Sequence, residues 1–264
     1  MVQNKRIEEM SWVEFEARSR EIETILVPMG SIEVEGPHLP LGVDSIVASE
    51  ICDKVSAGCD VLVGPLISVG YSDWHSGFKG TLNLSVETLT AVLREILHTL
   101  VECSLKRFIF ITPHVGNRQP IFSAATELRK KNLAIVAMID LWRLAHEMAG
   151  DIEGLKEKSF KHAGEIMTSV MLALRPDLVD MEKAVREELR SGVDSMIQET
   201  SSRVQFSGYH LEVFRTSREL TDSGVMGDPF NATREKGEEI IRRWVDYVRE
   251  FVQEFGKMPI HKVQ

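Results

Sequence analysis

Short apolar runs alternate with amphipathic segments along the first 140 residues of the chain. The runs end in polar or glycine-rich turns, and the segments between them carry apolar residues at helical spacing. The predicted strands are 22–29, 61–63, 108–111 and 133–139, and the predicted helices are 44–55, 86–104 and 120–131. This alternation predicts an α/β protein with a parallel sheet, covered by helices on both faces through right-handed crossovers.

The second half of the chain is less regular. A helix is predicted over 162–174, and a long amphipathic helix over 233–255 is expected to cover the core. Residues 180–214 are charged and fit neither period, so we interpret about 180–215 as an excursion or an oligomer contact. The length suits one domain or two. Because the sequence alone does not split the chain, we treat 1–264 as a single domain.

Candidate chemistry is concentrated in residues 26–44, the loop after the first strand. Glu33 and Glu35 are two residues apart, so in an extended segment both side chains leave on the same side. Asp44 comes just before a predicted helix that would hold its carboxylate in place. Converging carboxylates repel one another unless a cation lies between them. The loop therefore indicates either a divalent metal site or an ordinary acidic surface loop.

Four histidines stand in or beside predicted turns. His114 follows the third strand, which places it at the same sheet edge as the acidic loop; the alternative is a solvated loop histidine. His162 and Glu165 are three apart and would share one helix face, where Glu165 could instead cap the helix. His75 is either a substrate contact or a loop residue. His38, between two prolines, is interpreted as a structural hydrogen bonder.

Composition excludes several classes of function. The net charge of −9 argues against nucleic acid as a partner, and no apolar run approaches the roughly 20 residues of a membrane helix. The three cysteines lack the spacing of a zinc or redox motif, so we expect reduced packing residues in a cytoplasmic protein. The sequence also lacks a phosphate-binding G-x-x-x-x-G-K-[ST] loop, a G-x-G-x-x-G after the first strand and a G-x-S-x-G elbow.

Several segments resemble the creatininase family of metal-dependent amidohydrolases. The first are Gly30-Ser31-Ile32-Glu33, Gly36-Pro37-His38-Leu39-Pro40 and Asp44. Others follow in the family's order: Phe78-Lys79-Gly80-Thr81-Leu82, His114 with Gly116-Asn117, His162-Ala163-Gly164-Glu165 with Thr168-Ser169, and Gly224 to Pro229 with Ala232-Thr233 and Lys236-Gly237. The resemblance spans about residues 22–240.

The resemblance implies a three-layer α/β/α sandwich with a mostly parallel central sheet. It also implies two divalent ions per subunit, manganese, zinc or iron, that activate water to hydrolyse a non-peptide or cyclic amide C–N bond of a small molecule. A homo-oligomer is expected by the same analogy, with neither nucleic acid nor membrane as a partner.

The resemblance also implies site residues, each at the position of this chain that matches the family's motif. Glu33, Asp44 and His114 would be metal ligands with Asp44 as a bridge, and Glu165 would complete the set. His162 would move protons or support the metals, so His162 and Glu165 are the expected catalytic residues. The substrate-binding residues predicted on these segments are His75 and Asn117.

The departures from the family pattern concern the metals and the substrate. Glu35 stands where most of the family has histidine, and Gly116 stands where creatininase itself carries Glu, which argues against creatinine as the substrate. Thr112-Pro113, Val115 and Lys79 also depart from the pattern. With Glu35 as a further ligand, four anions would balance two divalent ions, and such an oxygen-rich set favours manganese, iron(II) or magnesium. The rival outcome is a weakened or lost metal position.

Two alternative functions follow from these departures. One is a formamide or short-peptide hydrolase of the same family. The other is a catalytically impaired member that acts as a binding or assembly protein.

Overall fold

The computed structural model describes residues 5–131, 133–157, 160–199 and 202–260. Its central sheet has four parallel strands in the order β2-β1-β3-β4. Their bounds are β1 Thr24–Pro28, β2 Leu62–Val63, β3 Arg107–Thr112 and β4 Ile135–Asp140. Leu26 of β1 lies opposite Val63 and Ile109 of the two neighbouring strands. The predicted parallel sheet is confirmed, with strand ends shifted by one or two residues.

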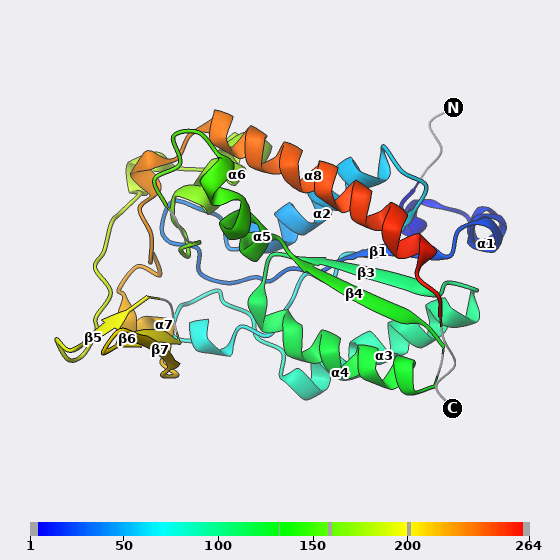
Figure 1. Cartoon of the computed structure of the whole chain (residues 1–264), viewed down its shortest axis with the longest axis horizontal. Helices are drawn as coiled ribbons and strands as arrows, with labels where there is room; N and C mark the ends of the chain where they lie inside the picture. The colour runs from blue at the N-terminus through cyan, green and yellow to red at the C-terminus, as the bar shows by residue number, and fades with distance from the viewer. Residues whose placement is uncertain (1–4, 132, 158–159, 200–201, 261–264) are drawn as a thin grey trace.

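Helices cover both faces of this sheet (Figure 1). On one face lie α2 Val43–Ser56, α5 Leu141–Met148, α6 Glu165–Leu174 and α8 Arg234–Lys257; on the other lie α3 Val86–Glu102 and α4 Arg118–Lys130. The helix α1 Trp12–Glu21 precedes β1. The three-layer α/β/α sandwich is therefore confirmed.

The alternation of side chains along the strands explains why there are two apolar layers. In β1, Leu26 packs in the layer beneath α2, α6 and α8, whereas Ile25 and Val27 pack in the layer beneath α3 and α4. In β3, Ile109 packs in the layer beneath α2, α6 and α8, and Phe110 packs in the layer beneath α3 and α4. Because both faces are buried, these strands appear in the sequence as continuous apolar runs, which is typical of parallel sheets.

The excursion predicted around residues 180–215 contains a second, antiparallel sheet. Its strands are β5 Met196–Gln198, β6 Arg203–Phe206 and β7 Tyr209–Glu212, followed by α7 Ser217–Leu220. Figure 1 shows this sheet at the end of the molecule, beside α7 and away from the central strands. Residues 200 and 201 of the excursion lie outside the described part of the chain.

One predicted helix begins later than its sequence pattern indicated. The helix predicted over 162–174 begins at Glu165, with Gly164 as its N-cap residue. Ala163 has a φ of +53°, in the left-handed region, so the chain turns sharply before the helix begins. His162 therefore lies in a turn, and the expected shared helix face of His162 and Glu165 is wrong.

Short 3-10 helices complete the secondary structure: η1 Ile7–Glu9, η2 Asp73–His75, η3 Val115–Asn117, η4 Ala149–Asp151, η5 Pro176–Leu178, η6 Met181–Lys183 and η7 Pro229–Asn231. Two of them, η2 and η3, lie in the loops that follow β2 and β3, at the carboxyl edge of the sheet. In the part of the chain that the structure describes, none of the helices has both the length and the apolarity needed to span a bilayer.

Candidate metal centre

The loop after β1 is held tightly against the first turn of α2. Gly30 makes this possible, because a Cβ atom there would lie 2.3 Å from the backbone nitrogen of Ser45. The backbone N–H of Glu33 donates to the carbonyl of Leu41 at 2.9 Å, which closes the loop. Glu33 and Asp44, eleven positions apart in sequence, are thereby brought to one place at the carboxyl edge of the sheet.

Glu33, Asp44 and His114 form the first group of candidate ligands. Nδ1 of His114 lies 3.3 Å from Oε1 of Glu33 and 3.3 Å from Oδ2 of Asp44. All three side chains are at most 3% exposed. Asp44 is held from behind, because Trp142 Nε1 and Ser31 Oγ each donate to its carboxylate at 2.9 Å.

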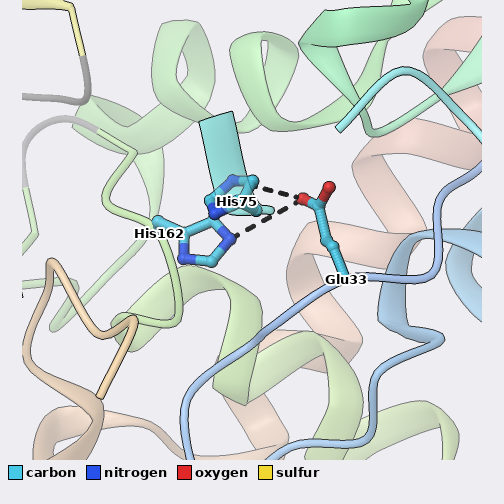
Figure 2. Close-up of side chains that lie close together, drawn as sticks. All are labelled: Glu33, His75 and His162. Carbon is cyan, nitrogen blue, oxygen red and sulfur yellow. Dashed lines mark ion pairs between the residues drawn. The ribbon is translucent and has the colours of Figure 1, made fainter. Parts of the chain in front are cut away.

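A second group shares Glu33 with the first. Figure 2 shows the imidazoles of His75 and His162 directed at one oxygen of Glu33. That oxygen, Oε1, lies 3.5 Å from Nε2 of His75 and 3.8 Å from Nε2 of His162. The two rings stack with their centroids 4.7 Å apart. Among the described residues, these two groups are the ones whose donor atoms converge closely enough to hold a metal ion.

The orientations of two imidazoles are fixed by backbone carbonyls on their outer sides. Nε2 of His114 donates to the carbonyl of Tyr71 at 2.7 Å, and Nδ1 of His162 donates to the carbonyl of Gly224 at 2.8 Å. Because a carbonyl can only accept, each of these nitrogens carries the proton, and the other ring nitrogen faces the carboxylates. Gly116 permits the first contact, since a Cβ there would lie 2.1 Å from the oxygen of Tyr71.

His75 is oriented by a hydroxyl group instead. Its Nδ1 lies 2.9 Å from Oγ of Ser217, the buried first residue of α7. Metal-binding histidines in proteins usually have such an outer hydrogen bond, which fixes the ring and its tautomer. All three imidazoles of the centre therefore have the arrangement expected of ligands.

Burial and mutual charge shift the pKa values in this cluster. Burial would raise the pKa of Glu33, but His114 and His75 hold it well below its usual range. Burial raises the pKa of Glu35 to about 8 and lowers the pKa of His75 to about 3. Burial opposes charge on His114 and His162, yet Glu33 and Glu35 respectively hold the pKa of each imidazole well above its ordinary value.

The buried polar atoms of the cluster fit a divalent cation. Oε2 of Glu33, both carboxylate oxygens of Glu35 and Nε2 of His162 have no hydrogen-bond partner among the described residues. Nε2 of His162 lies 3.0 Å from Oε2 of Glu35. Two donors that are each about 2.1 Å from one ion are separated by roughly 3.0–3.4 Å at angles of 90–109°. The observed separations of 3.0–3.8 Å are close to this range.

A cavity of about 590 Å³ opens beside both groups. Glu33, Asp44, His75, His114 and His162 line it. Apolar, basic and acidic side chains from other segments complete its wall, among them Trp74, Trp142, Phe160, Met167, Met226, Arg118, Arg143, Lys161, Arg203, Asp140 and Glu199. The cavity is large enough for a small molecule, and its wall presents apolar surface together with charged groups of both signs.

Glu165, predicted as a ligand, lies outside both groups. Its Oε2 accepts the backbone N–H groups of Lys156 at 2.8 Å and Glu157 at 2.7 Å, and its Oε1 accepts Nζ of Lys236 at 2.6 Å. The carboxylate is buried and fully engaged there. The structure therefore brings Glu33, Asp44 and His114 together but does not bring Glu165 to them.

Asn117 and His38 serve the scaffold of the centre. The amide of Asn117 donates to the carbonyl of Gly30 at 2.9 Å and to Oγ1 of Thr112 at 3.2 Å, and its side chain is completely buried. It joins the loops after β1 and β3 and does not line the cavity described above. His38 hydrogen bonds Thr168 at 3.0 Å, as predicted for a structural histidine.

Three side chains that orient the cluster were not predicted from the sequence: Ser31, Trp142 and Ser217. Trp142 follows the end of β4 by two residues, so the rule that function collects at strand ends could have indicated it. Ser31 lies inside the acidic loop itself. Ser217 gives no local signal, because it meets His75 across 142 positions of sequence.

Comparison with known proteins identifies the family of this chain. The creatininase model, described as creatinine amidohydrolase, matches residues 8–252. The chain is 29% identical to the creatinine amidohydrolase of Pseudomonas putida, covering 93% of this chain and 95% of that protein. It is also 29% identical to the mycofactocin precursor peptide peptidase of Mycolicibacterium smegmatis (strain ATCC 700084 / mc(2)155), covering 84% and 81% of the two chains.

Solved structures agree as well. A crystal structure of creatinine amidohydrolase superposes with a TM-score of 0.78 at 26% identity, covering 97% of this chain and 100% of that one. Similar structures include a mutant creatininase of Zn-Zn type and a creatininase with Mn. The family predicted from the sequence motifs is confirmed. The chain belongs to the creatininase family of hydrolases.

Proposed function

We propose that the protein is a metal-dependent amidohydrolase that cleaves the C–N bond of a small amide, with Glu33, Asp44 and His114 as ligands. The observation that carries this proposal is the buried Oε1 of Glu33, which faces three imidazoles that are each anchored from outside. When bound, divalent ions lower the pKa of a water from about 15.7 toward 7 and polarise the scissile carbonyl. Manganese, zinc and iron all suit this mixture of carboxylates and imidazoles.

The side chains around the centre orient the ligands, transfer the proton and exclude water. Ser31 and Trp142 hold the carboxylate of Asp44 in one orientation, so little reorganisation is needed during turnover. His162 or a carboxylate of the centre transfers the proton to the leaving nitrogen, since His162 and Glu33 both line the cavity. The apolar wall of the cavity excludes water around the substrate.

The test is hydrolysis of small cyclic amides and N-formyl compounds by protein loaded with manganese, zinc or iron(II). Glu33→Gln and His114→Ala should each abolish turnover while circular dichroism shows an unchanged fold. Glu95→Gln, on the exposed side of α3, is the matched control and should retain full activity. Full activity in both site variants would refute the assignment of the site.

A second cavity favours a short peptide as the alternative substrate. It measures about 790 Å³ and shares Trp74, Val115, Arg118 and Ser202 with the wall of the first cavity. A substrate that extends from the centre could continue into it, and one relative is a peptide peptidase. Peptides of two to six residues therefore belong in the same screen. A preference for them over cyclic amides would support peptide hydrolysis. If no substrate were cleaved and no metal bound, a binding or assembly role would be favoured.

We also propose a homo-oligomer in the cytoplasm. The second sheet and the segment after it carry exposed apolar side chains, including Ile197, Tyr209 and Phe214, which suits burial against another copy. All three cysteines are unpaired, which suits a reducing compartment. Light scattering coupled to size exclusion would measure the mass. Tyr209→Ser combined with Phe214→Ser should shift the protein toward the monomer.

A further inference from the structure

The first and second cavities have one stretch of wall in common, formed by Trp74, Val115, Arg118 and Ser202. Trp74 lies directly against the centre, because its ring stacks on the imidazole of His114 with the centroids 5.7 Å apart. A molecule with one end at the candidate ligands can therefore pass over this tryptophan into the second cavity. The side chains of the shared wall are in a position to select such a molecule.

Arg118, the first residue of α4, is the charged residue of the shared wall. Among the residues that the structure describes, its guanidinium group has neither an ion pair nor a hydrogen bond. The other Lys and Arg side chains of the two walls are engaged: Arg143 with Glu147, Lys161 and Arg203 with Glu199, and Arg215 with backbone carbonyls. A guanidinium group that is still unpaired suits a carboxylate, which it can bind through two parallel hydrogen bonds.

The acidic groups of the two walls limit where an anion can lie. Beyond the centre, most of them accept hydrogen bonds or ion pairs from neighbouring residues, namely Asp73, Asp140, Glu199 and Glu219. Glu212, on β7, is exposed and lines the second cavity but not the first. Its charge disfavours an anion deeper in the second cavity, so the position beside Arg118 suits an anion best.

Phe122 gives the second cavity an apolar wall close to this cation. It follows Arg118 by four positions on α4, so the two side chains lie on the same side of the helix, and both line the second cavity. The side chain of Phe122 is 69% exposed, and that of Val115, on the same wall, is 59% exposed. Adjacent apolar side chains that are exposed in a cavity are typical of a binding site.

We infer that Arg118 and Phe122 select the substrate, Arg118 by pairing with a carboxylate and Phe122 by covering an apolar group. The substrate class that fits is an N-acyl derivative of an apolar amino acid, short peptides with an apolar C-terminal residue included. In such a molecule the carboxylate and the side chain leave the same carbon atom, next to the amide nitrogen. This inference rests on the proposed function, because it takes the amide to be cleaved at the candidate ligands.

The experiment measures the binding of hydrocinnamate and of hydrocinnamyl alcohol to manganese-loaded protein by calorimetry. Both probes carry the phenyl group and neither has an amide bond, so the result does not depend on turnover. The wild type should bind the carboxylate about 10-fold more tightly than the alcohol. Arg118→Gln should bind the two probes with similar affinity. Phe122→Ser should weaken the binding of both probes by about 5-fold and keep the preference for the carboxylate.

Lys130→Gln is the matched control, because it removes a positive charge from the last residue of the same helix, outside both cavities. It should keep the wild-type affinities, and circular dichroism checks the fold of every variant. The role of Arg118 would be overturned if the wild type had no preference, if Arg118→Gln kept it, or if Lys130→Gln lost it equally. Unchanged affinities in Phe122→Ser would overturn the apolar part.

The outcomes also separate this inference from the proposed function. If Arg118→Gln kept the preference while the wild type hydrolysed amides, the selection by Arg118 would fail and the hydrolase proposal would stand. If the preference depended on Arg118 but the wild type cleaved no amide with manganese, zinc or iron(II), the hydrolase proposal would fail and the carboxylate site would stand.

Discussion

Glu165→Gln distinguishes a structural role of this carboxylate from the ligand role implied by family resemblance. Its two oxygens accept the side chain of Lys236 and the backbone N–H groups of Lys156 and Glu157 at 2.6–2.8 Å. These contacts hold the segment before His162 against α6 and α8. Because Glu165 lies outside both donor groups, we expect the variant to lose stability and to keep its metal.

The magnitude follows from the buried ion pair. Glutamine keeps one oxygen for the backbone N–H groups but turns an amide NH₂ toward the ammonium group of Lys236. Removing one partner of a buried pair costs about 3–5 kcal/mol. Lys236 is 15% exposed, so we expect the lower end, about 3 kcal/mol of unfolding free energy. In a chain of this length that lowers the Tm by roughly 6–12 °C.

The assay is guanidinium unfolding of chelator-treated protein, followed by tryptophan fluorescence, with manganese content measured separately on loaded protein. Glu157→Gln is the matched control, because burial raises the pKa of Glu157 to about 8 and its carboxyl is mostly protonated at pH 7. Its unfolding free energy should change by less than about 1 kcal/mol. A Glu165→Gln variant that lost metal while keeping wild-type stability would refute the reasoning.

Three further predictions address the surroundings of the centre. Ser217→Ala removes the hydroxyl that orients His75 and should weaken manganese binding at the centre by about 10–100-fold in calorimetric titration, with Ser217→Thr restoring it. Unchanged affinity would contradict this role. Burial lowers the pKa of His38 to about 4, so the unfolded chain takes up a proton at this histidine first as the pH falls below 6.5. The contribution of His38 to stability should therefore drop by about 2 kcal/mol between pH 7 and pH 5. Urea midpoints at pH 7 and pH 5 should show that His38→Gln lacks this part of the loss, whereas equal losses in both proteins would count against it. Gly116→Ala places a Cβ 2.6 Å from Nε2 of His114 and should lower kcat/KM by about 100-fold, and a wild-type value would show that the ring tolerates displacement.

The central sheet was predictable because its signal is local. Each strand is a short apolar run whose neighbours along the chain form amphipathic helices, and α3 buries Leu89, Leu93, Leu97 and Leu100 along one stripe. The helix α1 was missed, although the capping box of Ser11 and Glu14 marks its start. The start of α6 was placed too early, because Ala163 adopts a left-handed conformation that alanine seldom takes and that no residue pattern indicates.

The proximity of Glu33, Asp44 and His114 was predictable for a geometric reason. All three lie on segments next to the carboxyl ends of β1 and β3, and in a parallel sheet these ends share one edge. His75 and His162 lie on longer connections, and the sequence does not show where such connections fold back. Their approach depends on contacts with Ser217 and Gly224, which are 142 and 62 positions away.

The direction of two of the imidazoles depends on backbone carbonyl oxygens, which a sequence motif does not reveal. Two of the three rings are oriented by backbone carbonyls, of Tyr71 and Gly224, and every residue has a carbonyl. The side chains at these two positions do not make the hydrogen bonds, whereas the backbone path through them decides where the carbonyls point. It follows that the turn around Gly224, where φ is +83°, controls the direction of the inner nitrogen of His162 through the hydrogen bond to its outer nitrogen. A side chain there would meet Val34 at 2.6 Å and move that carbonyl, so metal binding should respond to this turn as well as to the ligands.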